Sequence, residues 1–207
     1  MTDMTYEQEA VPSRGPFPGP PAKRIIVSYG FWIFLLSDFV MFSAFFATYA
    51  VLAGETAGGP TGKQLFDLTT VAAETAALLA SSFACGMAAL AVMTAQAWKT
   101  YAASATTFVF GAVFLGLEIS EFARMVGEGA GPDRSAFLSA FFSLVGLHGL
   151  HVTAGLLWLI VMVGQIATRG YVPTTIRRFL CFALFWHALD IIWVALFTVV
   201  YLIGSGR

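Results

Sequence analysis

Two pairs of ionisable side chains with helical spacing stand inside apolar stretches of this sequence. His148 and His151 occur in GLHGLHVTAG, and His187 and Asp190 occur in FWHALDIIW. Residues three apart lie on nearly the same face of an α-helix, so each pair shares one face. Imidazole binds metal ions and haem iron, and it also exchanges protons near neutral pH. The spacing is therefore compatible with three roles, namely metal binding, proton transfer and hydrogen bonding between helices.

Four carboxylates stand in the same apolar surroundings, at Asp38, Glu74, Glu118 and Glu121. A charged side chain at the centre of a membrane helix costs roughly 2.5–3.5 kcal/mol, so these groups must face one another, water or another protein. We expect the three glutamates near the outer ends of their helices, where water reaches them. Asp38 is expected about a third of the way in from the cytoplasmic side, and His148 and His151 near mid-membrane.

Three interpretations of these polar residues remain open from the residues alone. A metal or haem site built on three histidines would usually keep a more compact spacing. A proton or ion path would run through Asp38, the histidines and Asp190. In the third interpretation the groups bond neighbouring helices, or a bound lipid head group, and hold the bundle in register. No phosphate loop, dinucleotide fingerprint or Gly-x-Ser-x-Gly turn accompanies them, so nothing indicates nucleophilic catalysis.

The elements that must position these residues are membrane-spanning helices. The 207 residues are 58% hydrophobic and 11% charged, with a mean hydropathy of +0.78, whereas about 25% of residues are charged in soluble domains. A helix needs about 20 apolar residues to cross a bilayer, and the eight prolines lie outside every such stretch. We predict an all-α membrane protein with one domain, 30–204, built from five transmembrane helices at about 30–53, 72–94, 102–123, 137–164 and 179–203.

Charges and aromatic residues predict how this bundle is oriented. Residues 1–29 contain five prolines before the first span and indicate a flexible cytoplasmic arm. With the N-terminus inside, seven basic residues fall on the cytoplasmic side and four on the other, which favours a periplasmic C-terminus. No Lys/Arg-rich run indicates nucleic-acid binding. Trp98, Tyr101 and Tyr201 stand near span ends, as expected of interfacial rings.

The polar segments, read in order, resemble subunit III of the haem–copper terminal oxidases. The matching pieces cover nearly all of residues 28–204 and are GFWIFLLSDFVMFSAFFATYAVL, ETAALLASS, GLEISEF, GPDRSAFLSAFFSLVGLHGLHVTAGLLWL and LFWHALDIIWVALFTVVYLIG. The five-span form is similar to bacterial members, because mitochondrial-type subunits have two further N-terminal helices. TAGGPTGK and GPDRSAFLSAFF look most like the cytochrome bo-type ubiquinol oxidase subunit III.

This resemblance implies a subunit without redox centres, in a complex that oxidises ubiquinol and reduces oxygen to water. The haem b, haem o and copper are expected in the catalytic subunit I. Subunits I, II and IV and membrane phospholipid are the expected partners, in a bacterial inner membrane. Asp38 matches the family's buried carboxylate in the first helix, where most cytochrome c oxidases have Glu. The other matching positions are Glu121, His148, His151, His187, Asp190 and Trp193, with no metal ligand among them.

Three alternatives accompany this interpretation. One is subunit III of a cytochrome c oxidase. From another class of protein, the second is a small transporter or channel subunit with an intramembrane proton path. The third, a di-haem cytochrome b, would require haem bound to this chain.

Overall fold

The structure, a computed structural model, describes residues 23–59, 65 and 67–204, and it contains five long helices. They are α1 (Lys23–Leu52), α3 (Leu68–Met93), α4 (Ala97–Gly127), α5 (Ala136–Arg169) and α6 (Pro173–Leu196). A single π-helical segment, η1 (Phe197–Leu202), continues α6 without a break. Each of the five helices is long and apolar enough to cross a membrane. The predicted fold class and number of spans are therefore confirmed.

Most helix ends lie one to seven residues beyond the predicted spans, whereas α1 and α3 end one residue before them, at Leu52 and Met93. α1 begins at Lys23, seven residues before the predicted start and inside the predicted arm 1–29; residues 1–22 of that arm lie outside the described residues. Pro173 stands in the first turn of α6. Proline suits this position, because the N–H that it lacks would have no partner inside the helix.

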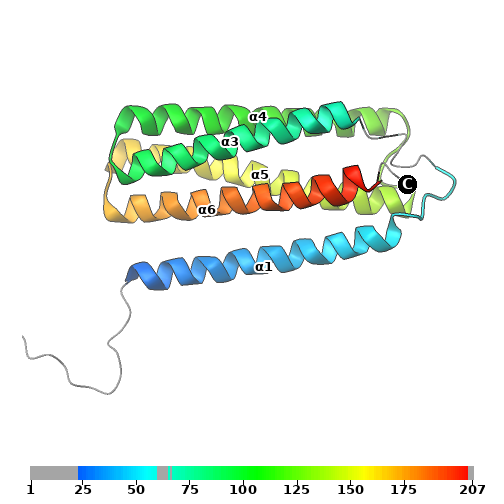
Figure 1. Cartoon of the computed structure of the whole chain (residues 1–207), viewed down its shortest axis with the longest axis horizontal. Coiled ribbons are helices and arrows are strands. Elements are labelled where there is room, and N and C mark those ends of the chain that lie inside the picture. The colour runs from blue at the N-terminus through cyan, green and yellow to red at the C-terminus, as the bar shows by residue number, and fades with distance from the viewer. Residues whose placement is uncertain (1–22, 60–64, 66, 205–207) are drawn as a thin grey trace, which may run out of the picture.

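Four helices form the bundle and the fifth lies along its side (Figure 1). α3 packs on α4 and α6, and α5 packs on α4 and α6, so these four helices close on one another. α1 contacts α5 and α6 and lies apart from α3 and α4 in Figure 1. Only 11% of the most apolar part of α1 is buried, against 56% for the span that α6 and η1 form together. α1 therefore presents most of its apolar surface to lipid or to a partner.

The indole of Trp186 joins three helices of this bundle to α6. A Cβ added at Gly155 of α5 would lie 2.7 Å from its Cζ3 atom, and one added at Gly111 of α4 would lie 3.0 Å from its Cζ2 atom. Both positions must be glycine for the ring to fit between α4 and α5. Its Nε1–H donates to Ser81 Oγ of α3 at 3.2 Å, and Ser81 donates in turn to the Thr107 carbonyl of α4 at 2.9 Å.

Asp67 caps the first turn of α3 outside the membrane-spanning segment. Its carboxylate accepts from the Thr70 hydroxyl at 2.9 Å and from the Thr69 N–H at 3.0 Å. These hydrogen bonds, that of Thr70 first, lower the pKa of Asp67 below its usual range. The cap satisfies one of the N–H groups that a helix start leaves open.

Candidate functional site

Glu74 of α3 and Glu118 and Glu121 of α4 form a buried carboxylate cluster between the helices. Their exposed fractions are 0%, 2% and 4%, respectively. The expectation that water reaches all three near the helix ends is therefore wrong for this chain. α3 and α4 pack closely along their length, and each glutamate stands on the face of its helix that meets the bundle. Glu74 interacts electrostatically with Glu121 and Glu118.

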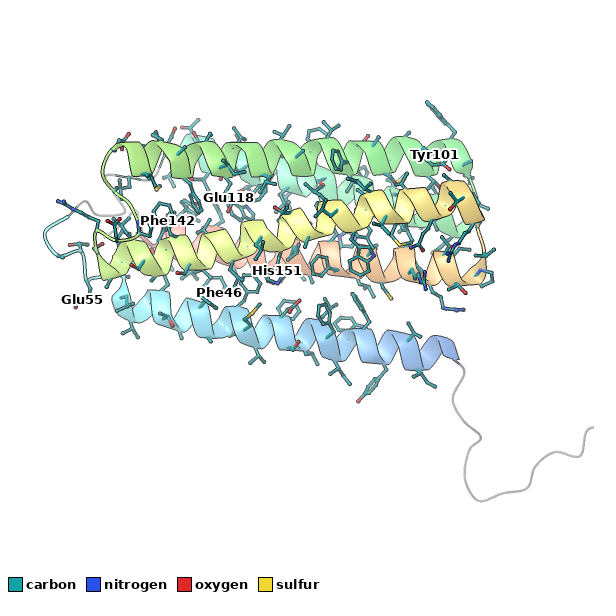
Figure 2. The ribbon with its side chains drawn as sticks, turned by 180° about the vertical axis from the view of Figure 1, so that it is seen from behind. Phe46, Glu55, Tyr101, Glu118, Phe142 and His151 are labelled. Atoms are coloured by element: carbon teal, nitrogen blue, oxygen red, sulfur yellow. The ribbon has the colours of Figure 1, made fainter. Side chains whose placement is uncertain are left out.

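Two further helical segments, α5 and η1, complete the surroundings of the carboxylate cluster, together with Arg124 of α4 itself. Glu118 projects between α4 and α5 (Figure 2) and meets the backbone of Gly149, where an added Cβ would lie 2.8 Å from Oε1. The Tyr201 hydroxyl of η1 donates to Glu121 Oε2 at 3.4 Å. Arg124 Nη2 lies 3.8 Å from Glu121 Oε1 and supplies a positive charge.

His148 is fully buried among aromatic rings. Its ring centre lies 5.2 Å from that of Trp193, 5.8 Å from Phe114 and 6.4 Å from Phe42. Neither ring nitrogen has a hydrogen-bond partner among the described residues. His148 therefore contributes packing, and it does not tie two helices by hydrogen bonding.

His151 lies on the side of α5 that faces α1 (Figure 2), one turn from His148. Its Nδ1 bonds the Leu147 carbonyl of its own helix at 2.8 Å, and its ring contacts that of Phe42 of α1 at 5.2 Å. Asp38 of α1 interacts electrostatically with this imidazole. The Asp38 carboxylate and the His151 imidazole thus interact across the contact between α1 and α5.

His187 and Asp190 of α6 share one face, as their spacing predicts, and both meet Ser82 of α3. The Ser82 hydroxyl lies 2.7 Å from His187 Nδ1 and also interacts with the Asp190 carboxylate. A turn further on, Trp193 Nε1 donates to Thr75 Oγ1 of α3 at 3.0 Å. Polar contacts thus join α6 to α3 over two turns.

The predicted site residues therefore lie in three places, with His148 packed separately among the rings of Trp193, Phe114 and Phe42. The carboxylate cluster lies toward the end of the bundle where α4 ends, Asp38 and His151 lie between α1 and α5, and His187, Asp190 and Trp193 lie between α6 and α3. Within the described ranges, no group of three or more His, Cys, Asp or Glu side chains is arranged to hold a metal ion.

Several residues that complete these contacts were not predicted from the sequence. They are Thr75, Ser81, Ser82, Gly149 and Tyr201. Tyr201 was expected at the membrane interface, but it is fully buried against Glu121. Tyr201 lies in the π-helical segment η1, whose wider turn differs from the α-helical register that the sequence predicted. The serines and threonines could have been found by asking which hydroxyls lie on the buried face of α3.

Comparison with known proteins identifies the family. The family model for cytochrome c oxidase subunit III matches residues 17–205. A cytochrome bo(3) ubiquinol oxidase subunit 3 of Pseudomonas aeruginosa is 52% identical, over 86% of this chain and 85% of its own length. A quinol oxidase subunit 3 of Bacillus spizizenii is 44% identical, over 86% of this chain and 87% of its own length. A cytochrome c oxidase subunit 3 of a Bacillus species is 40% identical, over 91% and 93%. The chain therefore belongs to the cytochrome c oxidase subunit III family and is a subunit III of a terminal oxidase.

Proposed function

We propose that the chain is subunit III of a bo-type ubiquinol oxidase, in which it carries no redox group and stabilises the catalytic subunit. The observation that carries the choice of donor is the 52% identity with a ubiquinol oxidase subunit, against 40% with a cytochrome c oxidase subunit. Cytochrome c remains the second candidate donor, because that relative matches along 91% of this chain.

The surroundings of the histidines support a role without a redox group. His148 is packed on aromatic rings, His151 bonds its own helix, and His187 bonds Ser82. The three imidazoles thus contact different partners. They do not converge on one point, as the ligands of one metal ion would. Haem b, haem o and copper then belong to the catalytic subunit of the complex.

A groove between α1, α3 and α6 supports phospholipid binding. It has a volume of about 660 Å³, and its walls include Val27, Met93, Leu180 and Leu184. Arg177, one turn into α6, stands among these apolar side chains. A guanidinium near a helix end suits a lipid phosphate, while the apolar wall suits an acyl chain.

The chain is a multi-pass membrane protein, and we place it in a bacterial inner membrane with its N-terminus in the cytoplasm. Basic residues are more frequent at the end of the bundle where residues 94–96 connect α3 to α4 and residues 170–172 connect α5 to α6. This excess supports the orientation. Cysteine substitutions in intact cells test it. Asp133→Cys should react with a membrane-impermeant maleimide, whereas Val172→Cys should react only after lysis. The opposite pattern would reverse the orientation.

Affinity purification from the native membrane tests the function itself. A tag on this chain should bring down subunits I, II and IV with haem absorbance and oxygen consumption driven by ubiquinol. Consumption driven by reduced cytochrome c alone would select the second donor. Purification of the chain without haem-bearing partners, together with solute flux in liposomes, would instead support a transporter. A stoichiometric haem band in this chain by itself would contradict the proposed role.

A further inference from the structure

The carboxylate cluster contains more buried oxygen atoms than its surroundings can satisfy. Both carboxylate oxygens of Glu74, Oε2 of Glu118 and Oε1 of Glu121 have no hydrogen-bond partner among the described residues. All four atoms are shielded from solvent, and Glu74 reaches the other two acids from a different helix. Such atoms are stabilised by a proton between two carboxyl groups or by a bound ligand, because an unpaired buried acceptor is costly.

The charges around the cluster do not balance three ionised carboxylates. Arg124 is the one cation paired with these acids in the described part of the chain, and it is shared with Glu128 at 3.3 Å. From the N-cap of α3 the Asp67 carboxylate adds a negative charge that acts on Glu121. From η1 the Tyr201 hydroxyl donates a hydrogen bond, and from α5 the cluster meets the Gly149 backbone, next to the aromatic-packed His148.

We propose that Glu74, Glu118 and Glu121 form a proton-binding site, which holds about two protons when one carboxylate is ionised opposite Arg124. Neighbouring carboxyls in a low-dielectric interior cannot all ionise, and a shared proton satisfies the oxygens that lack partners. Its three carboxyl groups stand on α3 and α4, whereas Asp38 stands on α1. It goes beyond the proposed function, since it assigns a proton-binding role within this subunit.

The site exchanges its protons with water at the end of the bundle where α4 ends. The Glu121 side chain is 2% exposed, whereas that of Arg124, one turn further along, is 42% exposed. Glu121, beside the half-exposed Arg124, is therefore the member of the cluster that lies nearest to solvent and exchanges protons with it.

Infrared spectroscopy of the full chain, purified with its partners through an affinity tag, tests this site. Protonated carboxyl groups give a C=O stretching band that shifts in D₂O. Difference spectra of wild type against E74Q, E118Q and the double variant should each show loss of such a band. The double variant should lose about twice the intensity of either single variant. D38N is the matched control, and its difference spectrum should leave the bands assigned to the cluster unchanged.

A second variant reports on the charge balance. R124Q removes the one paired cation, so the remaining carboxylate should also bind a proton and the C=O intensity should increase. Unchanged C=O intensity in the double variant would overturn the proposal, as would loss of assembly in every glutamine variant, because glutamine mimics the protonated acid in size and charge. Purification without oxidase partners would contradict the proposed function but would leave these difference spectra interpretable.

Discussion

Replacing Gly155 by alanine should destabilise the bundle, because the added methyl group has no space. Its Cβ would lie 2.7 Å from Cζ3 and 2.9 Å from Cε3 of Trp186, and 3.3 Å from Cε1 of Phe185. An ordinary contact begins at 3.4 Å, so the indole would have to move by about 0.7 Å, well over the few tenths of an ångström that a core yields without strain. The ring is 1% exposed and is also in close contact with Gly111.

The magnitude follows from two effects on the same side chain. Overpacking a core costs about 1–3 kcal/mol. Displacing the indole also breaks its hydrogen bond with Ser81, which contributes about 1 kcal/mol. We expect a loss of about 2–4 kcal/mol in the free energy of unfolding, which lowers the folded-to-unfolded ratio about 30-fold or more.

Unfolding of the full-length protein in detergent micelles by SDS, followed by circular dichroism, measures this change. Gly164→Ala is the matched control, since Gly164 lies on the same helix and nothing lies within 4 Å of an added Cβ. Alanine there should be neutral or stabilising by up to about 1 kcal/mol, because alanine favours the helix more than glycine does. If Gly155→Ala and Gly164→Ala unfold at the same SDS concentration, the close approach of Trp186 does not determine stability and the reasoning is refuted.

Three further changes test other contacts. A double-mutant cycle with Trp193→Phe and Thr75→Val should give a coupling energy of about 1 kcal/mol, as expected of one buried hydrogen bond; additive effects would show that this bond contributes nothing. His148→Leu should keep stability within about 1 kcal/mol of wild type, because the imidazole has no hydrogen bond to any described residue, and a loss of several kcal/mol would reveal an essential polar role. Asp38→Ala should leave oxygen reduction intact but shorten the active lifetime under turnover, since the carboxylate interacts with His151 across the α1–α5 contact; immediate inactivity of an assembled, haem-loaded complex would contradict an accessory role.

The acid dependence of stability provides another prediction, at Asp67. Hydrogen bonds from Thr70 and Thr69 lower the pKa of Asp67 in the folded chain, so the folded state binds this proton less tightly than the unfolded state does. The stabilisation that this cap gives the folded state is therefore fully present when the pH is above the usual pKa of aspartate. It is lost as the pH falls through the lowered pKa of Asp67. Asp67→Asn should remove this part of the acid-induced loss of stability. Identical stability-against-pH curves for the two proteins would show that the cap does not couple to protonation.

The sequence was sufficient to predict the five helices, their order and the family. The length of an apolar stretch identifies a membrane span without knowledge of the helices that pack on it, because the bilayer imposes the same requirement on each segment. The motifs around His148 and His187 likewise indicate the family from adjacent residues. Both predictions depend on information that is local in the chain.

The partners of the polar residues were decided by the tertiary structure. His148 and His151 stand in one motif, yet one is enclosed by aromatic rings and the other faces α1 and Asp38. Glu74 meets Glu118 and Glu121 only because α3 packs on α4. A charge or hydrogen-bond partner from another helix leaves no local signal in the sequence, and burial depends on which faces the helices turn toward one another.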